Sequence, residues 1–127
     1  MTPLAEVLAA EPNWHSSAMS FVGAEGLTQY LPEVAVREML EDVSRETGTG
    51  SKFALTFVGW REAENRPEAG PKTDKVLRQL AARGEPWLWG CEPAKLDTFL
   101  EGAGWVILVR PNLAGWDNLT VLGTRAF

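Results

Sequence analysis

The sequence predicts an α/β fold in which helices flank a sheet. Short apolar runs at 20–24, 52–59 and 105–109 are typical of buried strands. Between the first two runs, apolar residues recur every three or four positions, which predicts an amphipathic helix. A strand–helix–strand unit of this length can make a crossover connection, so we expect these two strands to be parallel.

A short helix is predicted over residues 3–11, before the first strand. Its apolar residues have helical spacing. They are Leu4, Val7 and Leu8. We expect this helix to belong to an N-terminal arm over 1–19, and residues 20–127 to form the rest of a single domain.

Pro32 opens the second predicted helix, because proline is favoured in a first helical turn. The side of this helix that we expect to face inward comprises Val36, Met39, Leu40 and Val43. Gly48 and Gly50 are expected to end it. The run at 52–59 is almost wholly apolar, which favours a central strand that is covered on both faces.

The middle of the chain is predicted to contain a polar loop, a helix and an extended segment. Residues 61–71 are rich in Pro, Gly and Glu, which indicates a loop. A helix is predicted over 73–83, with Gly84 as its end. Its apolar side comprises Val76, Leu77 and Leu80. Residues 85–90 are expected to be extended.

The last third of the chain is predicted to form a helix followed by two strands. Pro93 opens the helix and Gly102 ends it. Its inward residues are expected to be Leu96, Phe99 and Leu100. Strands are predicted at 105–109 and 119–124, and residues 110–118 have a length compatible with a hairpin connection.

Composition excludes several classes of function. The net charge of −5 argues against a nucleic-acid footprint, which needs a basic face. A single histidine, His15, and a single cysteine, Cys91, make no metal-ligand cluster, and a lone cysteine suits a reducing cytoplasm. No apolar run approaches the roughly 20 residues of a membrane span. The six tryptophans are interpreted mainly as packing residues, with Trp87 and Trp89 as the best candidates for an aromatic wall against a flat substrate or for a subunit interface.

The stretch from Phe21 to Pro32 carries the clearest functional pattern. An apolar strand ends on Glu25 and Gly26, and the chain then turns towards a helix. Open α/β sheets bind ligands at the carboxyl ends of their strands, and a glycine there lets a ligand approach the backbone. The pattern therefore predicts a ligand site at Glu25 and Gly26.

Two motifs resemble segments of a known family. They are Ala24-Glu25-Gly26 with Tyr30-Leu31-Pro32, and Gly84-Glu85-Pro86-Trp87 with a later Gly104-Trp105. Together they resemble class I S-adenosylmethionine-dependent methyltransferases related to leucine carboxyl methyltransferases and polyketide O-methyltransferases. The resemblance covers about residues 20–127. It implies a partial Rossmann-like sheet equivalent to strands 4-5-7-6 of that family, with the last strand antiparallel and helices flanking it.

The resemblance also implies roles for four residues. Glu25 matches the carboxylate that accepts a hydrogen bond from the amino group of S-adenosylmethionine, and Gly26 the small residue that permits close approach. Tyr30 and Trp87 match residues beside the substrate pocket. For each of them, a purely structural role as a solvated or capping carboxylate, a turn glycine or a packed ring remains open. No catalytic residue is predicted, because methyl transfer from a sulfonium needs alignment more than acid–base groups.

The sequence departs from the family in one large respect. The glycine-rich loop after the first strand and the acidic residue after the second strand are absent, and Gly48-Thr49-Gly50 ends a helix instead of opening one. The chain is therefore expected to be the C-terminal half of such an enzyme, truncated relative to the family and holding one wall of the cofactor crevice.

This departure leads to two hypotheses. The first is an O-methyltransferase acting on a carboxylate or hydroxyl of a small molecule, with a partner that supplies the missing strands. The second is a non-catalytic binding or oligomerisation module. In both, the first strand is an exposed edge that the N-terminal helix or a second copy is expected to cover, so a homodimer is predicted.

Overall fold

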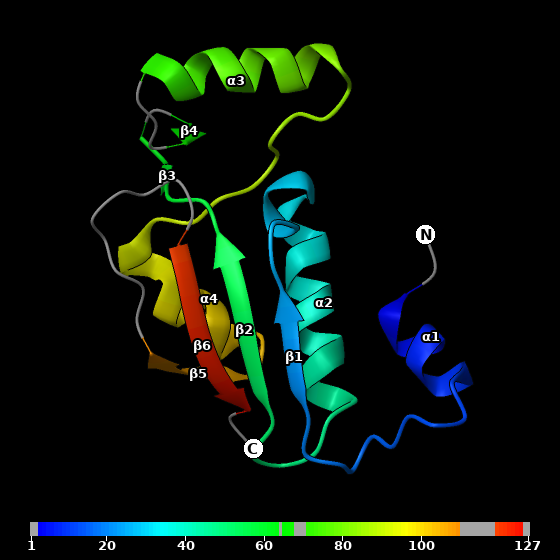
Figure 1. The fold of residues 1–127 in the computed structure, drawn as a ribbon. Helices are drawn as coiled ribbons and strands as arrows, with labels where there is room; N and C mark the ends of the chain where they lie inside the picture. The colour runs from blue at the N-terminus through cyan, green and yellow to red at the C-terminus, as the bar shows by residue number, and fades with distance from the viewer. Residues whose placement is uncertain (1–2, 64, 68–70, 110–118, 126–127) are drawn as a thin grey trace.

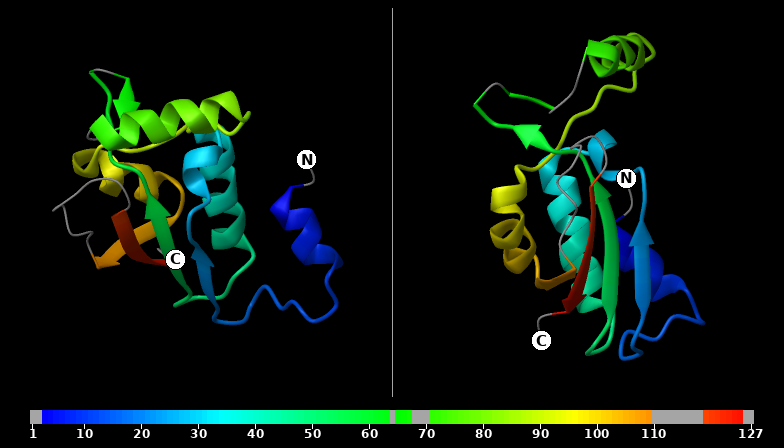
Figure 2. Two further views of the ribbon diagram at one scale, coloured as in Figure 1. Left: turned by 45° about the horizontal axis from the view of Figure 1, so that its top comes forward. Right: turned by 60° about the vertical axis from the view of Figure 1, so that its left-hand side comes forward.

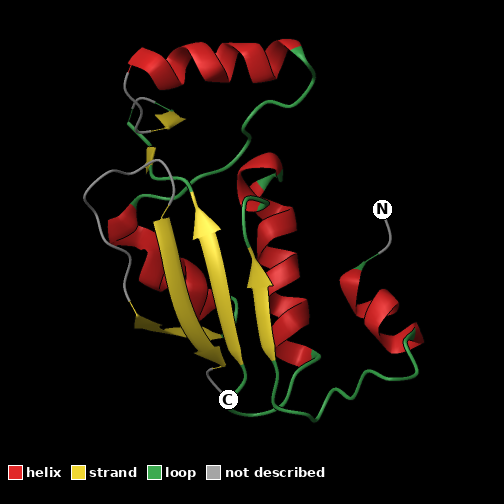
Figure 3. Ribbon diagram, in the orientation of Figure 1, coloured by secondary structure: helices red, strands yellow, loops and turns green. Residues whose placement is uncertain are grey.

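Four strands form the main sheet of the protein, in the order β1-β2-β6-β5. The computed structural model describes residues 3–63, 65–67, 71–109 and 119–125. The strands are β1 (Phe21–Ala24), β2 (Lys52–Phe57), β5 (Trp105–Val109) and β6 (Leu119–Arg125). The helices are α1 (Leu4–Ala10), η1 (Thr28–Tyr30), α2 (Glu33–Arg45), α3 (Pro71–Ala82), η2 (Pro93–Lys95) and α4 (Leu96–Gly102). Figure 3 distinguishes the two kinds of element.

The strand directions agree with the predicted topology. β1 and β2 run parallel, with Phe21 opposite Lys52 and Ala24 opposite Leu55. β6 lies between β2 and β5 and is antiparallel to both. The predicted parallel pair and the predicted antiparallel last strand are therefore confirmed. The connection at 110–118 lies outside the described residues.

One face of the sheet is packed against α2 and α4 (Figures 1 and 2). Alternate residues of β2 point towards these helices, and all of them are buried: Phe53, Leu55 and Phe57. The predicted inward residues of the two helices are also buried, except Met39, which is half-buried. They are Val36, Leu40, Val43, Leu96, Phe99 and Leu100. The helical periodicity thus identified the core correctly.

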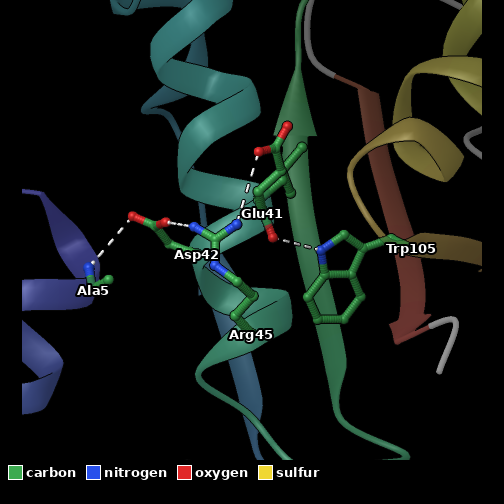
Figure 4. A network of polar contacts seen from close by, with 6 residues as sticks. Ala5, Glu41, Asp42, Arg45 and Trp105 are labelled. Atoms are coloured by element: carbon green, nitrogen blue, oxygen red, sulfur yellow. Dashed lines mark hydrogen bonds and ion pairs between the residues drawn. The ribbon is translucent and has the colours of Figure 1, made fainter.

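Trp105 fixes β5 to the helix layer. Its ring packs edge-on against Phe53, with ring centroids 5.5 Å apart. Its indole N–H donates to the Leu40 carbonyl over 2.9 Å, so the buried polar atom is satisfied (Figure 4).

The opposite face of the sheet carries no helix among the described residues (Figure 2). Phe21 is 68% exposed and Val106 is 44% exposed, while Lys52 and Ala54 are half-buried. The prediction that both faces of the 52–59 strand would be covered is therefore wrong for the described residues. An apolar run indicates that a strand is buried, and here the face that α2 and α4 cover accounts for most of the buried residues.

The N-terminal helix packs on α2 and not on the edge of β1 (Figure 1). The Ala5 amide donates to the Asp42 carboxylate over 3.4 Å, and Arg45 also pairs with this carboxylate (Figure 4). The Trp14 indole donates to the Glu46 carbonyl over 2.9 Å. In the described part of the chain, β2 is the only strand that pairs with β1. The expectation that α1 covers this edge is thus not met.

The region predicted as a loop at 61–71 contains a short hairpin instead. β3 (Trp60–Arg61) pairs antiparallel with β4 (Arg66–Pro67), and α3 follows from Pro71. The next helix end was predicted correctly. Gly84 has φ +76°, and the amides of Gly84 and Glu85 bond the carbonyls of Ala81 and Leu80, as in a Schellman motif.

α3 lies beyond the carboxyl ends of β1 and β2 (Figure 1). Among the helices that the structure describes, none has both the length and the apolar character needed to cross a membrane.

Candidate functional site

The turn after β1 is held by hydrogen bonds to the end of β2. Gly26 has φ +66°, a conformation that favours glycine, and its amide donates to the Thr56 hydroxyl over 2.8 Å. The Thr28 hydroxyl, which is fully buried, donates to the Thr56 carbonyl over 2.8 Å. These bonds fix the backbone that follows Glu25, while the Glu25 side chain stays exposed.

Glu25 borders a hollow of about 330 Å³ on the open face of the sheet. The floor of this hollow includes Gly23 and Ala54, and Thr56 stands beside it. Even a methyl group added at Gly23 would meet no atom within 4 Å. A ligand can therefore reach the sheet here, and the Glu25 carboxylate is available to accept hydrogen bonds from it.

Tyr30 lies in a different hollow, of about 600 Å³, which Gly84, Glu85, Pro86 and Leu88 also line. A hydrogen bond joins the 84–88 segment to the segment that carries Tyr30: the Leu88 amide donates to the Gln29 carbonyl over 2.6 Å. Tyr30 is 37% exposed, so its ring remains accessible.

Trp87 is half-buried and does not line the hollow of Tyr30, although both of its chain neighbours do. Its indole N–H is buried and has no hydrogen-bond partner among the described residues. The structure thus brings Tyr30 to the 84–88 segment, but Glu25 and Trp87 lie outside the hollow of Tyr30.

A third and larger hollow, of about 810 Å³, was not predicted from the sequence. It is formed by α2, the β3 hairpin, residues 88–91 and α4, and it lies on the helix-covered side of the sheet. Its lining comes from four separate parts of the chain, so no local motif marks it. Gly90 is one of its lining residues, and an added Cβ there would lie 2.6 Å from the Val58 carbonyl oxygen, a contact that the sequence does not reveal.

Two ion pairs border this larger hollow, which we call the Cys91 cavity. Glu33 pairs with Arg37 over 3.4 Å, and Glu62 pairs with Lys95. Burial first, and then the nearby carboxylates with Glu62 foremost, raise the pKa of the Cys91 thiol to about 12, while Lys95 lowers it by less. The hydrogen bond with Glu62 raises the pKa of Lys95.

No group of three or more potential metal-ligating side chains occurs in the part of the chain that the structure describes. At the Glu25 hollow, the exposed carboxylate can accept hydrogen bonds and Gly23 leaves the backbone accessible.

No protein-family model and no curated protein matches the sequence. Solved structures do match the fold. A possible exported protein from Bordetella parapertussis has a TM-score of 0.63 at 18% identity, over 91% of this chain and 42% of that one.

Several of the matching structures are methyltransferases. The S-adenosylmethionine-dependent methyltransferase SibL, in its apo form, has a TM-score of 0.59 at 11% identity, over 91% of this chain and 33% of that one. Human N-acetylserotonin methyltransferase, in complex with S-adenosylmethionine, has a TM-score of 0.58 at 10% identity, over 85% of this chain and 29% of that one. The chain spans well under half the length of these three proteins. At such identities the likeness concerns the fold, and the fold of this chain is a partial Rossmann-like sheet of the methyltransferase type.

Proposed function

We propose that this chain forms one wall of the cofactor site of an S-adenosylmethionine-dependent O-methyltransferase. The observation that carries the proposal is the Glu25–Gly26 turn, which stands at the carboxyl end of β1 beside an accessible hollow. Ligands of open α/β sheets bind in this position. The methyltransferase structures that share the fold support the same reading.

Each residue has a defined role in this proposal. The Glu25 carboxylate accepts a charge-assisted hydrogen bond from the ammonium group of the cofactor. Gly26 lets the cofactor approach the backbone. Tyr30 and Trp87 belong to the side of the methyl acceptor, a small molecule with a carboxylate or hydroxyl group. The protein contributes mainly alignment, because the sulfonium is already activated.

The second wall of the site comes from a partner in this proposal. β1 has an edge that no described strand occupies, and a β-strand edge presents unpaired amides and carbonyls to another strand. A glycine-rich strand–loop–helix segment placed along β1 would face the Glu25 hollow. A second polypeptide that carries such a segment is the candidate partner, whereas a second copy of this chain supplies only a strand for the edge of β1.

Calorimetry with S-adenosylhomocysteine tests the proposal. We expect no measurable heat with the purified chain alone, and binding when the chain is co-purified with a co-encoded polypeptide that carries a glycine-rich βαβ segment. In that complex Glu25→Gln should weaken binding about tenfold, the equivalent of about 1.4 kcal/mol. Glu6→Gln, an exposed glutamate of α1, is the matched control and should change nothing. A complex that binds the cofactor equally well with Glu25→Gln would contradict the role of Glu25.

A second function is supported by the open face of the sheet. If the chain is a non-catalytic oligomerisation module, its interface comprises the open face of the sheet and the edge of β1. Phe21 lies on both of these surfaces. Self-association without any binding of S-adenosylhomocysteine, alone or with a partner, would favour this module over the enzyme.

A further inference from the structure

The Cys91 cavity is independent of the Glu25 hollow. The two share no lining residue, and they lie on opposite faces of the sheet. A volume of about 810 Å³ is within the range of small-molecule sites. The cavity therefore has room for a ligand of its own.

Aromatic rings line the cavity, and one of them already contacts a positively charged side chain. The guanidinium of Arg37 lies 4.8 Å from the centroid of the Phe99 ring, and Trp89 packs against the same ring at 5.1 Å. Trp60 lines the other side and is only half-buried, so part of its ring remains accessible. Trp is the aromatic side chain with the strongest attraction for cations.

Three carboxylates lie at or beside the cavity, together with the Arg37 and Lys95 cations that also line it. Glu33 and Glu62 line the cavity, and the Glu92 carboxylate accepts a hydrogen bond from the Glu62 amide over 3.1 Å. These three carboxylates raise the pKa of the Cys91 thiol at the floor, and Lys95 lowers it by less. A carboxylate has lone pairs for a second donor after it has paired with Lys or Arg.

We infer that the Cys91 cavity binds an organic ammonium ion with a flat apolar body. The apolar body packs against Trp60, and the ammonium group donates to Glu33 and Glu62. This inference goes beyond the proposed function, because it assigns a second ligand site that does not depend on S-adenosylmethionine.

Three probes that share a phenylethyl group test the ligand class. They are 2-phenylethylamine, 2-phenylethanol and 3-phenylpropionate, which are cationic, neutral and anionic at pH 7. Binding to the full chain is followed by tryptophan fluorescence and by calorimetry. We expect the amine to bind at least about tenfold more tightly than the other two. Equal binding of the alcohol or the anion would overturn the inference.

Variants of opposite sign locate the site. Glu62→Gln should weaken binding of the amine about tenfold, whereas Lys95→Gln should strengthen it several-fold, because it frees the Glu62 carboxylate. A general loss of structure cannot produce both effects. Glu101→Gln is the control, since Glu101 is exposed on α4 and does not line the cavity. If Glu62→Gln and Glu101→Gln behave alike, the amine does not bind in this cavity.

Discussion

Gly90 lies where the chain has no room for a side chain. An added Cβ would lie 2.6 Å from the Val58 carbonyl oxygen and 2.7 Å from a ring carbon of Trp60. We expect Gly90→Ala to lower the free energy of unfolding by about 1–3 kcal/mol, because the backbone and the indole must move apart. Urea denaturation measures this loss.

Gly23→Ala is the matched control for this prediction. Its new methyl group would meet no atom within 4 Å, and Gly23 lies in an exposed position of β1. The free energy of unfolding should therefore change by no more than about 0.5 kcal/mol. Equal losses in the two variants would show that glycine at 90 is not required by packing.

Cys91 is predicted to be unreactive in the folded chain. Its pKa rises from 9.0 to about 12, first through burial and then through Glu62, Glu33 and Glu92. A difference of about three pH units lowers the thiolate fraction about 1,000-fold. Alkylation by iodoacetamide at pH 8 should therefore be slower in the folded chain than in about 8 M urea, by a factor on the order of 1,000. Similar rates in both conditions would contradict the burial of the thiol.

The raised pKa of Cys91 makes the free energy of unfolding depend on pH in the alkaline range. Between the two pKa values, the thiol stays protonated in the folded chain but is ionised in the unfolded chain. Folding therefore takes up a proton in this pH range, and the free energy of unfolding falls as the pH rises. The contribution of Cys91 is fully present below pH 9.0 and is lost progressively as the pH rises towards about 12. In Cys91→Ala this part of the alkaline decline should be missing from urea titrations.

At the scale of elements, helices of equal length differ in how firmly they are held. α1 and α4 each have 7 residues, but α1 has no buried residue, whereas α4 buries Leu96, Phe99 and Leu100. Hydrogen exchange should therefore be at least about 100-fold faster for the α1 amides than for the α4 amides. Equal protection would mean that the contact between α1 and α2 is stronger than its few hydrogen bonds indicate.

At the scale of the whole molecule, the edge of β1 and the open sheet face remain to be covered. If a second copy covers them, light scattering should give at least twice the monomer mass of 14.0 kDa. Phe21→Lys should then return the chain to a monomer, because a charged edge opposes strand pairing. Val76→Lys, the same kind of change on α3, should leave the mass unchanged. A wild-type chain that is monomeric at about 100 µM, a concentration at which edge-mediated association of copies would be populated, would exclude self-pairing.

Much of the fold could be predicted from the sequence, and the candidate site only in part. The period of 3.6 residues identified α2 and α4, and short apolar runs identified the strands of the main sheet, because burial leaves a local pattern in the sequence. The Glu25–Gly26 turn was found for a similar reason, since a strand end followed by a glycine is local. The hydrogen bonds from this turn to Thr56 were not predicted, because their partners are about thirty residues apart.

The sequence by itself determined the strands of the main sheet, the helices, their order and the core-facing residues of α2 and α4, but not the hairpin of β3 and β4. Only the tertiary structure decided that α1 packs on α2, that one face of the sheet is open, and that Cys91 lies in a cavity among charged and aromatic side chains. The physical reason is the range of the interactions. Periodicity and turn chemistry act over a few residues, whereas surfaces and cavities arise where distant segments meet. The Glu25–Gly26 turn depends on both, because its residues are local but its ligand-facing hollow is built across two strands.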